Sequence, residues 1–119
     1  MTLEELTFLQ KKFDHAHKSA FCWDSPITQE NLEMMEFLLM ALMGELGEIS
    51  NIAKKIIRGD FTLAEKKPEL SEEIADMFIY LIKLSYQLGV DLELAYTEKM
   101  AKNQDRFKHY EKNDALDWD

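Results

Sequence analysis

The sequence predicts an all-α protein, a four-helix bundle, on three observations. Apolar residues recur at steps of three and four along most of the chain, and no stretch keeps the alternating pattern of a strand. Only four Gly and two Pro occur, and they divide the 119 residues into four segments of helical length. Hydrophobic residues make up 46% of the chain. We therefore expect a single domain over residues 1–119, with its core at about 28–110.

Each expected helix has its own start or stop signal. Residues 3–19 show helical apolar spacing, and the loop AFCWDSPIT follows them. A long helix is expected from about residue 28 to Arg58, with Gly59 as its C-terminal stop. A third is expected over about 69–88, after Pro68, and a fourth from a cap at Asp91 to about residue 110. The tail EKNDALDWD is left unassigned.

Charge and composition exclude several classes of protein. Fourteen Lys and Arg against 23 Asp and Glu give a net charge of -9, which repels duplex nucleic acid. No apolar run reaches the length of a membrane-spanning helix, and the N-terminus lacks the pattern of a signal peptide. The single cysteine, Cys22, excludes an internal disulfide. We expect a soluble cytoplasmic protein with neither membrane nor duplex nucleic acid as a partner.

The two central helices carry more apolar surface than a small monomer needs. Residues 69–88 are apolar almost all round, so this helix is expected at the centre. The long helix before it carries a seam at alternating steps of three and four, namely Leu32, Met35, Leu39, Leu42, Leu46, Ile49, Ala53 and Ile56. This surplus predicts a homo-dimer or a homo-tetramer.

Two pairs of carboxylates interrupt apolar helix sectors. Glu45 and Glu48 are three residues apart and share a sector with Met34, Leu38, Ala41, Ile52 and Ile56. Glu73 and Asp76 repeat the spacing on the next helix. Buried acids without partners are costly, and a divalent cation removes that cost. Four hard oxygen donors suit Mg²⁺, with Mn²⁺ as the alternative, although acid pairs at this spacing also occur as ordinary helix-surface residues.

A di-iron carboxylate site is the rival interpretation of the acids, and the sequence excludes it. Such bundles use Glu-x-x-His on two helices. None of His15, His17 and His109 follows a Glu at that spacing.

With these motifs in place, the sequence resembles the MazG-like all-α nucleoside triphosphate pyrophosphohydrolases, in particular their dCTP pyrophosphatase-like subgroup. The resemblance rests on the ordered set GELGE, EEIADMFIYL and KMAKNQDRF and covers about residues 35–107. It implies Mg²⁺-dependent hydrolysis of a nucleoside triphosphate, often a deoxynucleotide or noncanonical one, to the monophosphate and pyrophosphate. Nucleotide-pool cleansing is a role consistent with this reaction, and the sequence leaves signalling open as the alternative.

The resemblance also implies roles for individual residues. Glu45, Glu48, Glu73 and Asp76 would hold the metal, with Glu48 and Glu45 as the catalytic acids. Glu48 is the first candidate for general base, a choice that the sequence leaves open. The implied substrate-binding residues are Trp23, Lys55, Tyr80, Lys99, Asn103 and Arg106. Tyr80 serves equally well as core filling, Lys55 as a solvated helix end and Arg106 as part of a surface ion pair.

Two other functions stay open at this stage. A non-catalytic helical interaction module would explain the apolar seam, and it predicts no metal dependence. Phosphoribosyl-ATP pyrophosphohydrolase activity would use a related acid site on the same fold for another substrate. The sequence names neither the preferred base nor the sugar.

Overall fold

The computed structural model describes residues 1–17 and 20–111, which form four α-helices and one short 3₁₀ turn. The elements are α1 (Leu3–Ala16), α2 (Glu33–Arg58), α3 (Leu63–Gln87), α4 (Leu92–Arg106) and the turn η1 (Lys108–Tyr110). None of the described residues forms a strand. The predicted all-α class is therefore confirmed.

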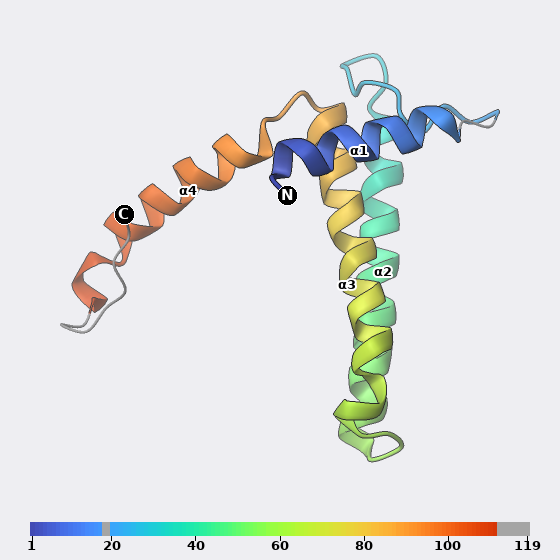
Figure 1. The fold of residues 1–119 in the computed structure, drawn as a ribbon, viewed down its shortest axis with the longest axis vertical. Helices are drawn as coiled ribbons and strands as arrows, with labels where there is room; N and C mark the ends of the chain where they lie inside the picture. Colours follow the sequence, from blue (N-terminus) through green and yellow to red (C-terminus); the bar gives the residue numbers. More distant parts are fainter. Residues whose placement is uncertain (18–19, 112–119) are drawn as a thin grey trace.

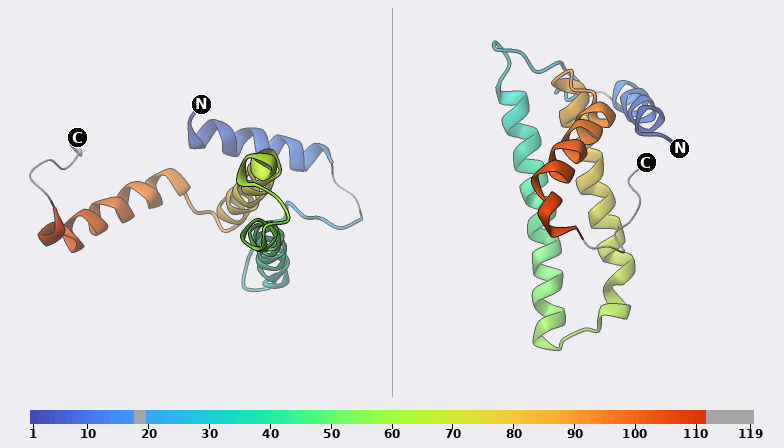
Figure 2. Two further views of the ribbon diagram at one scale, coloured as in Figure 1. Left: turned by 90° about the horizontal axis from the view of Figure 1, so that it is seen from below. Right: turned by 90° about the vertical axis from the view of Figure 1, so that its left-hand side faces the viewer.

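The centre of the molecule is an antiparallel hairpin of α2 and α3, which lie side by side along their whole length (Figure 1). Helix α1 crosses the open end of this hairpin, and α4 projects away from it (Figures 1 and 2). Among the described elements, α4 contacts α1, α3 and η1 but not α2. The four helices of one chain therefore do not close into the predicted four-helix bundle.

This arrangement is extended for a chain of its length. The radius of gyration is 18.1 Å, whereas a compact domain of 119 residues has a value of about 13.5 Å. Much of the apolar surface predicted to be a seam is consequently open. Leu39 and Leu46 are 44% and 52% exposed, and they lie off the face that packs against α3.

The core lies between α2 and α3, on the sector that carries the acids. Met34, Leu38 and Ile52 are buried on α2, and Ile82 is buried on α3. These α2 residues share the sector of Glu45 and Glu48, so the acids are on the packed side of the helix. The expectation that the third helix occupies the centre also holds, because α3 contacts α1, α2 and α4.

Helix α2 begins five residues later than predicted and ends where predicted. The chain before it is held in a turn, because the Asn31 amide nitrogen bonds to the Thr28 carbonyl at 3.0 Å and its side chain donates to the Pro26 carbonyl at 2.8 Å. At the other end, Gly59 has a φ of 94°, the left-handed conformation that glycine adopts without strain.

Helix α3 begins six residues earlier than predicted, so the placement of its start after Pro68 was wrong. Thr62 caps the helix by accepting a 3.2 Å hydrogen bond from the Glu65 amide. Pro68 then lies within the helix. Its missing N–H affects the exposed second turn, where the Ala64 residue faces water, so the helix continues through the proline.

The outer helices are shorter than predicted. Helix α1 starts with a capping box between Thr2 and Glu5 and ends at Ala16. The last two residues of the helix predicted over 3–19 lie outside the described residues. Asp91 caps α4 as predicted, with its Oδ1 accepting from the Leu94 amide at 3.0 Å. The helix ends at Arg106, and the predicted last turn is the 3₁₀ turn instead.

In the part of the chain that the structure describes, no helix combines the length and the hydropathy needed to cross a bilayer.

Candidate functional site

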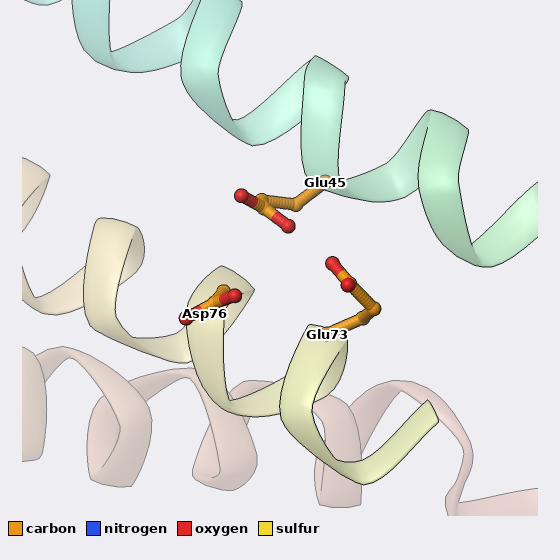
Figure 3. Close-up of side chains that lie close together, drawn as sticks. All are labelled: Glu45, Glu73 and Asp76. Carbon is orange, nitrogen blue, oxygen red and sulfur yellow. The ribbon is translucent and has the colours of Figure 1, made fainter. Parts of the chain in front are cut away.

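The acids meet in the middle of the hairpin. Glu45 projects from α2 toward Glu73 and Asp76 on α3, and all three side chains are half-buried (Figure 3). One carboxylate oxygen of each residue lies within 4.8 Å of one oxygen of the other two. The spacing of three residues places Glu73 and Asp76 on one face of α3, and antiparallel packing brings Glu45 opposite them.

Glu48 lies beside this trio, exposed at its edge. Hydrogen bonding and charge repulsion from Glu73 raise the pKa of the Glu48 carboxyl, and partial loss of water adds to the effect. The pKa of Glu73 is also raised, first by Glu45, with which it would share a proton. The cluster is therefore electrostatically unfavourable when every carboxyl is ionised.

The donor set fits a hard divalent cation. One oxygen of Glu45 and one of Glu73, Oε2 in each case, are buried without a hydrogen-bond partner. The lone pairs of these two oxygens are therefore available to a cation. Carboxylate oxygens are the ligands that Mg²⁺ prefers, and its two positive charges would offset the repulsion that raises the pKa values.

A cleft of about 340 Å³ adjoins the acids on the side of the α2–α3 turn. This volume is within the range of small-molecule pockets, about 300–1,000 Å³. Its walls come from both helices and consist of Glu48, Asn51, Ile52, Lys55, Lys66, Glu69 and Glu73. The predicted residue Lys55 is thus placed next to the acids. Lys66 was not predicted, because the sequence analysis placed it outside the third helix.

Tyr80 and Trp23 lie on the other side of the acids, around the side chain of Lys83. The Lys83 ammonium is 5.6 Å from the centre of the Trp23 ring and 5.8 Å from that of Tyr80. Burial, with repulsion from Glu45 and Asp76, raises the pKa of the Tyr80 hydroxyl. The structure therefore brings both predicted aromatic residues to the side chain of Lys83, and Tyr80 also lies beside Glu45 and Asp76.

A buried polar network fixes Trp23 there. Its Nε1 donates to the Asp14 carbonyl at 3.4 Å, and its carbonyl accepts from Gln87 Nε2 at 2.9 Å. Asp14 also pairs with Lys83, with 3.5 Å between Oδ1 and Nζ. The sequence analysis missed Asp14, Lys83 and Gln87. A signal was available only for the two α3 residues, which continue the heptad spacing of the acids.

Lys99, Asn103 and Arg106 lie on α4, which projects away from the hairpin (Figure 1). Within one chain the structure does not bring these three residues to the acid cluster. The prediction that they lie on one helical face is consistent with their positions on α4, whereas their role in binding stays a prediction.

Two antiparallel helices that enclose a carboxylate cluster define an all-α protein with a candidate divalent-metal site. Comparison with known families identifies the class further. Residues 33–111 match the model of the MazG nucleotide pyrophosphohydrolase domain, which covers most of the chain. The chain belongs to this family, and the resemblance stated from the motifs is confirmed.

Individual relatives point to the same subgroup. The chain is 35% identical over 80 residues to gene 37 protein of Mycobacterium phage L5, which covers 65% of this chain and 69% of that protein. It is 35% identical to dCTP pyrophosphatase 1 of Homo sapiens over 74 residues, and to that of Rattus norvegicus over 79. Each of these two alignments covers 59% of this chain and 44% of the relative, so the chain spans less than half of their length. No solved structure matches the chain significantly.

Proposed function

We propose that the protein hydrolyses a nucleoside triphosphate to the monophosphate and pyrophosphate in a Mg²⁺-dependent reaction. The observation that carries the proposal is the acid cluster, in which oxygens of Glu45, Glu73 and Asp76 lie within 4.8 Å of one another. Membership of a nucleotide pyrophosphohydrolase family gives such a cluster a chemical purpose. The proposal treats residues 1–119 as one domain, acting in the cytoplasm.

Glu45, Glu73 and Asp76 would hold the cation, together with Glu48 when its carboxyl turns inward. When bound, the cation supplies a Lewis acid that neutralises phosphate charge and lowers the pKa of a coordinated water. The protein's own contribution is to hold these carboxylates on two packed helices, where their geometry does not depend on loop conformation.

Glu48 is the proposed general base, with Glu45 as the second candidate. It lies outside the trio and is open to solvent, so a water can reach it. It would accept a proton from the attacking water as the new bond forms at the α-phosphorus. The bond from this phosphorus to the bridging oxygen breaks, and pyrophosphate leaves with that oxygen.

The remaining groups would bind the substrate. Lys55 lines the cleft beside the acids and would contact phosphate oxygens. Tyr80 and Trp23 would contact the nucleoside, because both offer aromatic surface around Lys83, and Tyr80 also lies beside Glu45 and Asp76. The relatives named dCTP pyrophosphatase make a deoxycytidine nucleotide the first substrate to test, with removal of unwanted deoxynucleotides as the proposed role.

A screen of nucleoside triphosphates tests this function. Wild-type protein with Mg²⁺ is expected to release monophosphate and pyrophosphate from at least one canonical or modified substrate, with deoxycytidine triphosphate and phosphoribosyl-ATP included. Glu48→Gln keeps the side-chain shape and removes the base, so its rate is expected to fall by about 100-fold or more. Intact substrates in every wild-type reaction, with no Mg²⁺-induced thermal shift, would contradict the proposal and favour a non-catalytic interaction module.

The proposal includes a homo-dimer or homo-tetramer. The accessible area is 9352 Å², against about 6,700 Å² for a compact monomer of this mass. All residues of α4 are described, and none of them is buried. A second copy that covers these surfaces would allow Lys99, Asn103 and Arg106 to approach the phosphates at a neighbouring acid cluster.

Met43→Glu is expected to shift the assembly toward smaller species. Met43 is 71% exposed on α2, near Met40 and Leu46, which are also exposed. A carboxylate in an apolar interface would be desolvated without a partner. Light scattering coupled to size-exclusion chromatography measures the mass, with Lys12→Glu at an exposed position on α1 as the control. Equal masses for wild type and Met43→Glu, or a monomeric wild type, would contradict the assembly.

A further inference from the structure

The cleft beside the acid cluster holds two lysines, one from each helix. Lys55 comes from α2 and Lys66 from α3, and both line the same space of about 340 Å³ as Glu48 and Glu73. Glu48 and Glu73 line one end of the cleft, and the two lysines line the other end together with Glu69. Such a cleft can bind an anion that carries a divalent cation, because the cation faces the acids and the free anionic oxygens face the lysines.

Lys66 is held in place before any ligand arrives. Its Nζ donates to Glu69 Oε2 at 2.9 Å and lies 4.0 Å from the centre of the Phe61 ring. Its side chain is 22% exposed. An ammonium group has three N–H donors, so Lys66 can keep the bond to Glu69 and still donate to a phosphate oxygen. Little side-chain entropy remains to be lost when such a ligand binds.

The register of the hairpin places the two lysines and the aromatic residues on opposite sides of the acids. Lys66 precedes Glu73 by seven residues, which is two helical turns on the same face and about 10 Å along the axis. Lys55 follows Glu48 by seven residues, and the antiparallel packing puts both lysines toward the turn at Gly59. Tyr80 lies seven residues after Glu73, in the opposite direction, where Trp23 also lies.

We propose that Lys66, with Lys55, binds the β- and γ-phosphates of the substrate. The nucleotide then lies along the hairpin, with the polyphosphate toward the α2–α3 turn, the α-phosphate at the acids and the nucleoside on the side of Tyr80 and Trp23. This inference rests on the proposed function and adds to it a binding residue and a substrate orientation. If Lys66 had only a structural role, its ammonium would form the ion pair with Glu69 and would not contact the ligand.

Calorimetric binding of the two products tests the orientation. Inorganic pyrophosphate and deoxycytidine monophosphate are each titrated, with Mg²⁺, into the wild type, Lys66→Ala and Lys67→Ala. Lys67 is the neighbouring, exposed lysine, and it does not line the cleft. Lys66→Ala is expected to weaken pyrophosphate binding by about tenfold or more and to leave monophosphate binding within about twofold. Lys67→Ala is expected to leave both unchanged.

The other possible results contradict either the role of Lys66 alone or the proposed function as well. The role of Lys66 is overturned if Lys66→Ala binds pyrophosphate as tightly as the wild type, if Lys67→Ala loses as much pyrophosphate affinity, or if only monophosphate binding is weakened. Substrate turnover by the wild type would then leave the proposed function in place. A wild type that binds neither product and turns over no triphosphate overturns the proposed function and this inference together. Circular dichroism and the Mg²⁺-induced thermal shift must match the wild type, since a misfolded Lys66→Ala would lose both.

Discussion

Glu73→Gln is expected to abolish substrate turnover and, without metal, to make the folded protein more stable. Glutamine keeps the shape of the side chain but removes one negative charge from the centre of the cluster. Its amide is a weaker cation ligand than a carboxylate, so turnover should fall by at least about 100-fold. Stability should rise because the pKa values of Glu73 and Glu48 are both raised by neighbouring carboxyls, which shows that their ionised forms repel one another.

The raised pKa values determine how the stability of the metal-free protein changes with pH. Both carboxyls have a pKa in the folded protein that lies above the ordinary value of 4.5. Between the ordinary and the raised pKa, the folded protein therefore binds more protons than the unfolded chain. Stability of the metal-free protein should therefore fall as the pH rises through this window and level off above it. Glu73→Gln should flatten that fall, because Glu73 is also the largest cause of the raised Glu48 pKa.

Thermal unfolding in the presence of a chelator, from pH 4 to pH 8, measures the effect. Mg²⁺ should stabilise the wild type increasingly as the pH rises, since it binds the ionised carboxylates, and should stabilise Glu73→Gln much less. Glu72→Gln is the matched control, because Glu72 is an exposed neighbour on α3 outside the trio. A Glu73→Gln protein that is less stable than wild type at pH 7 without metal would show that repulsion among the carboxyls does not destabilise the fold.

The acid cluster could be predicted from the sequence because its geometry is almost entirely local. A spacing of three residues fixes two side chains on one helical face, and burial of that face follows from the apolar residues around it. Glu45, Glu73 and Asp76 therefore meet as soon as α2 and α3 pack as a hairpin. Nothing about this step depends on loop conformation or on a distant element.

The predictions that failed depend on information that is not local. Pro68 normally disfavours a helix interior, yet the Thr62 cap starts α3 before it, and this misplaced start hid the register that carries Lys66 into the cleft. The direction of α4 could not be derived either, because spacing within a helix does not say against which element it packs. The network of Asp14 and Lys83 joins residues 69 positions apart, and although Lys83 continues the heptad spacing of the acids, nothing in the sequence pairs it with Asp14.

Asp14→Ala is expected to cost about 3–5 kcal/mol in free energy of unfolding, the range for breaking a buried ion pair. Asp14 and Lys83 are 2% and 8% exposed. The carboxylate accepts from the Tyr86 hydroxyl at 2.6 Å and from Gln10 Nε2 at 2.9 Å, in addition to its pairing with Lys83. Alanine would leave a buried ammonium and a part-buried hydroxyl without these partners.

The loss should separate α1 from the hairpin. The apolar side chains of Phe8 and Phe13 on α1 are 65% and 58% exposed, so burial of these rings contributes little to docking. The polar bonds of Asp14 therefore account for a large share of the contact between α1 and α3. Because Trp23 Nε1 donates to the Asp14 carbonyl, movement of α1 should also displace the Trp23 ring from Lys83.

A double variant distinguishes the cost of leaving Lys83 without a partner from the contribution of the ion pair itself to stability. Asp14→Leu combined with Lys83→Met removes both charges and keeps apolar volume, so it should recover most of the stability lost by Asp14→Ala. Urea unfolding at one fixed protein concentration measures all three proteins, with the exposed Asp105→Ala on α4 as a control expected within about 0.5 kcal/mol of wild type. If the double variant is no more stable than Asp14→Ala, hydrogen bonds to Tyr86 and Gln10, rather than the charge of Lys83, hold α1 in place.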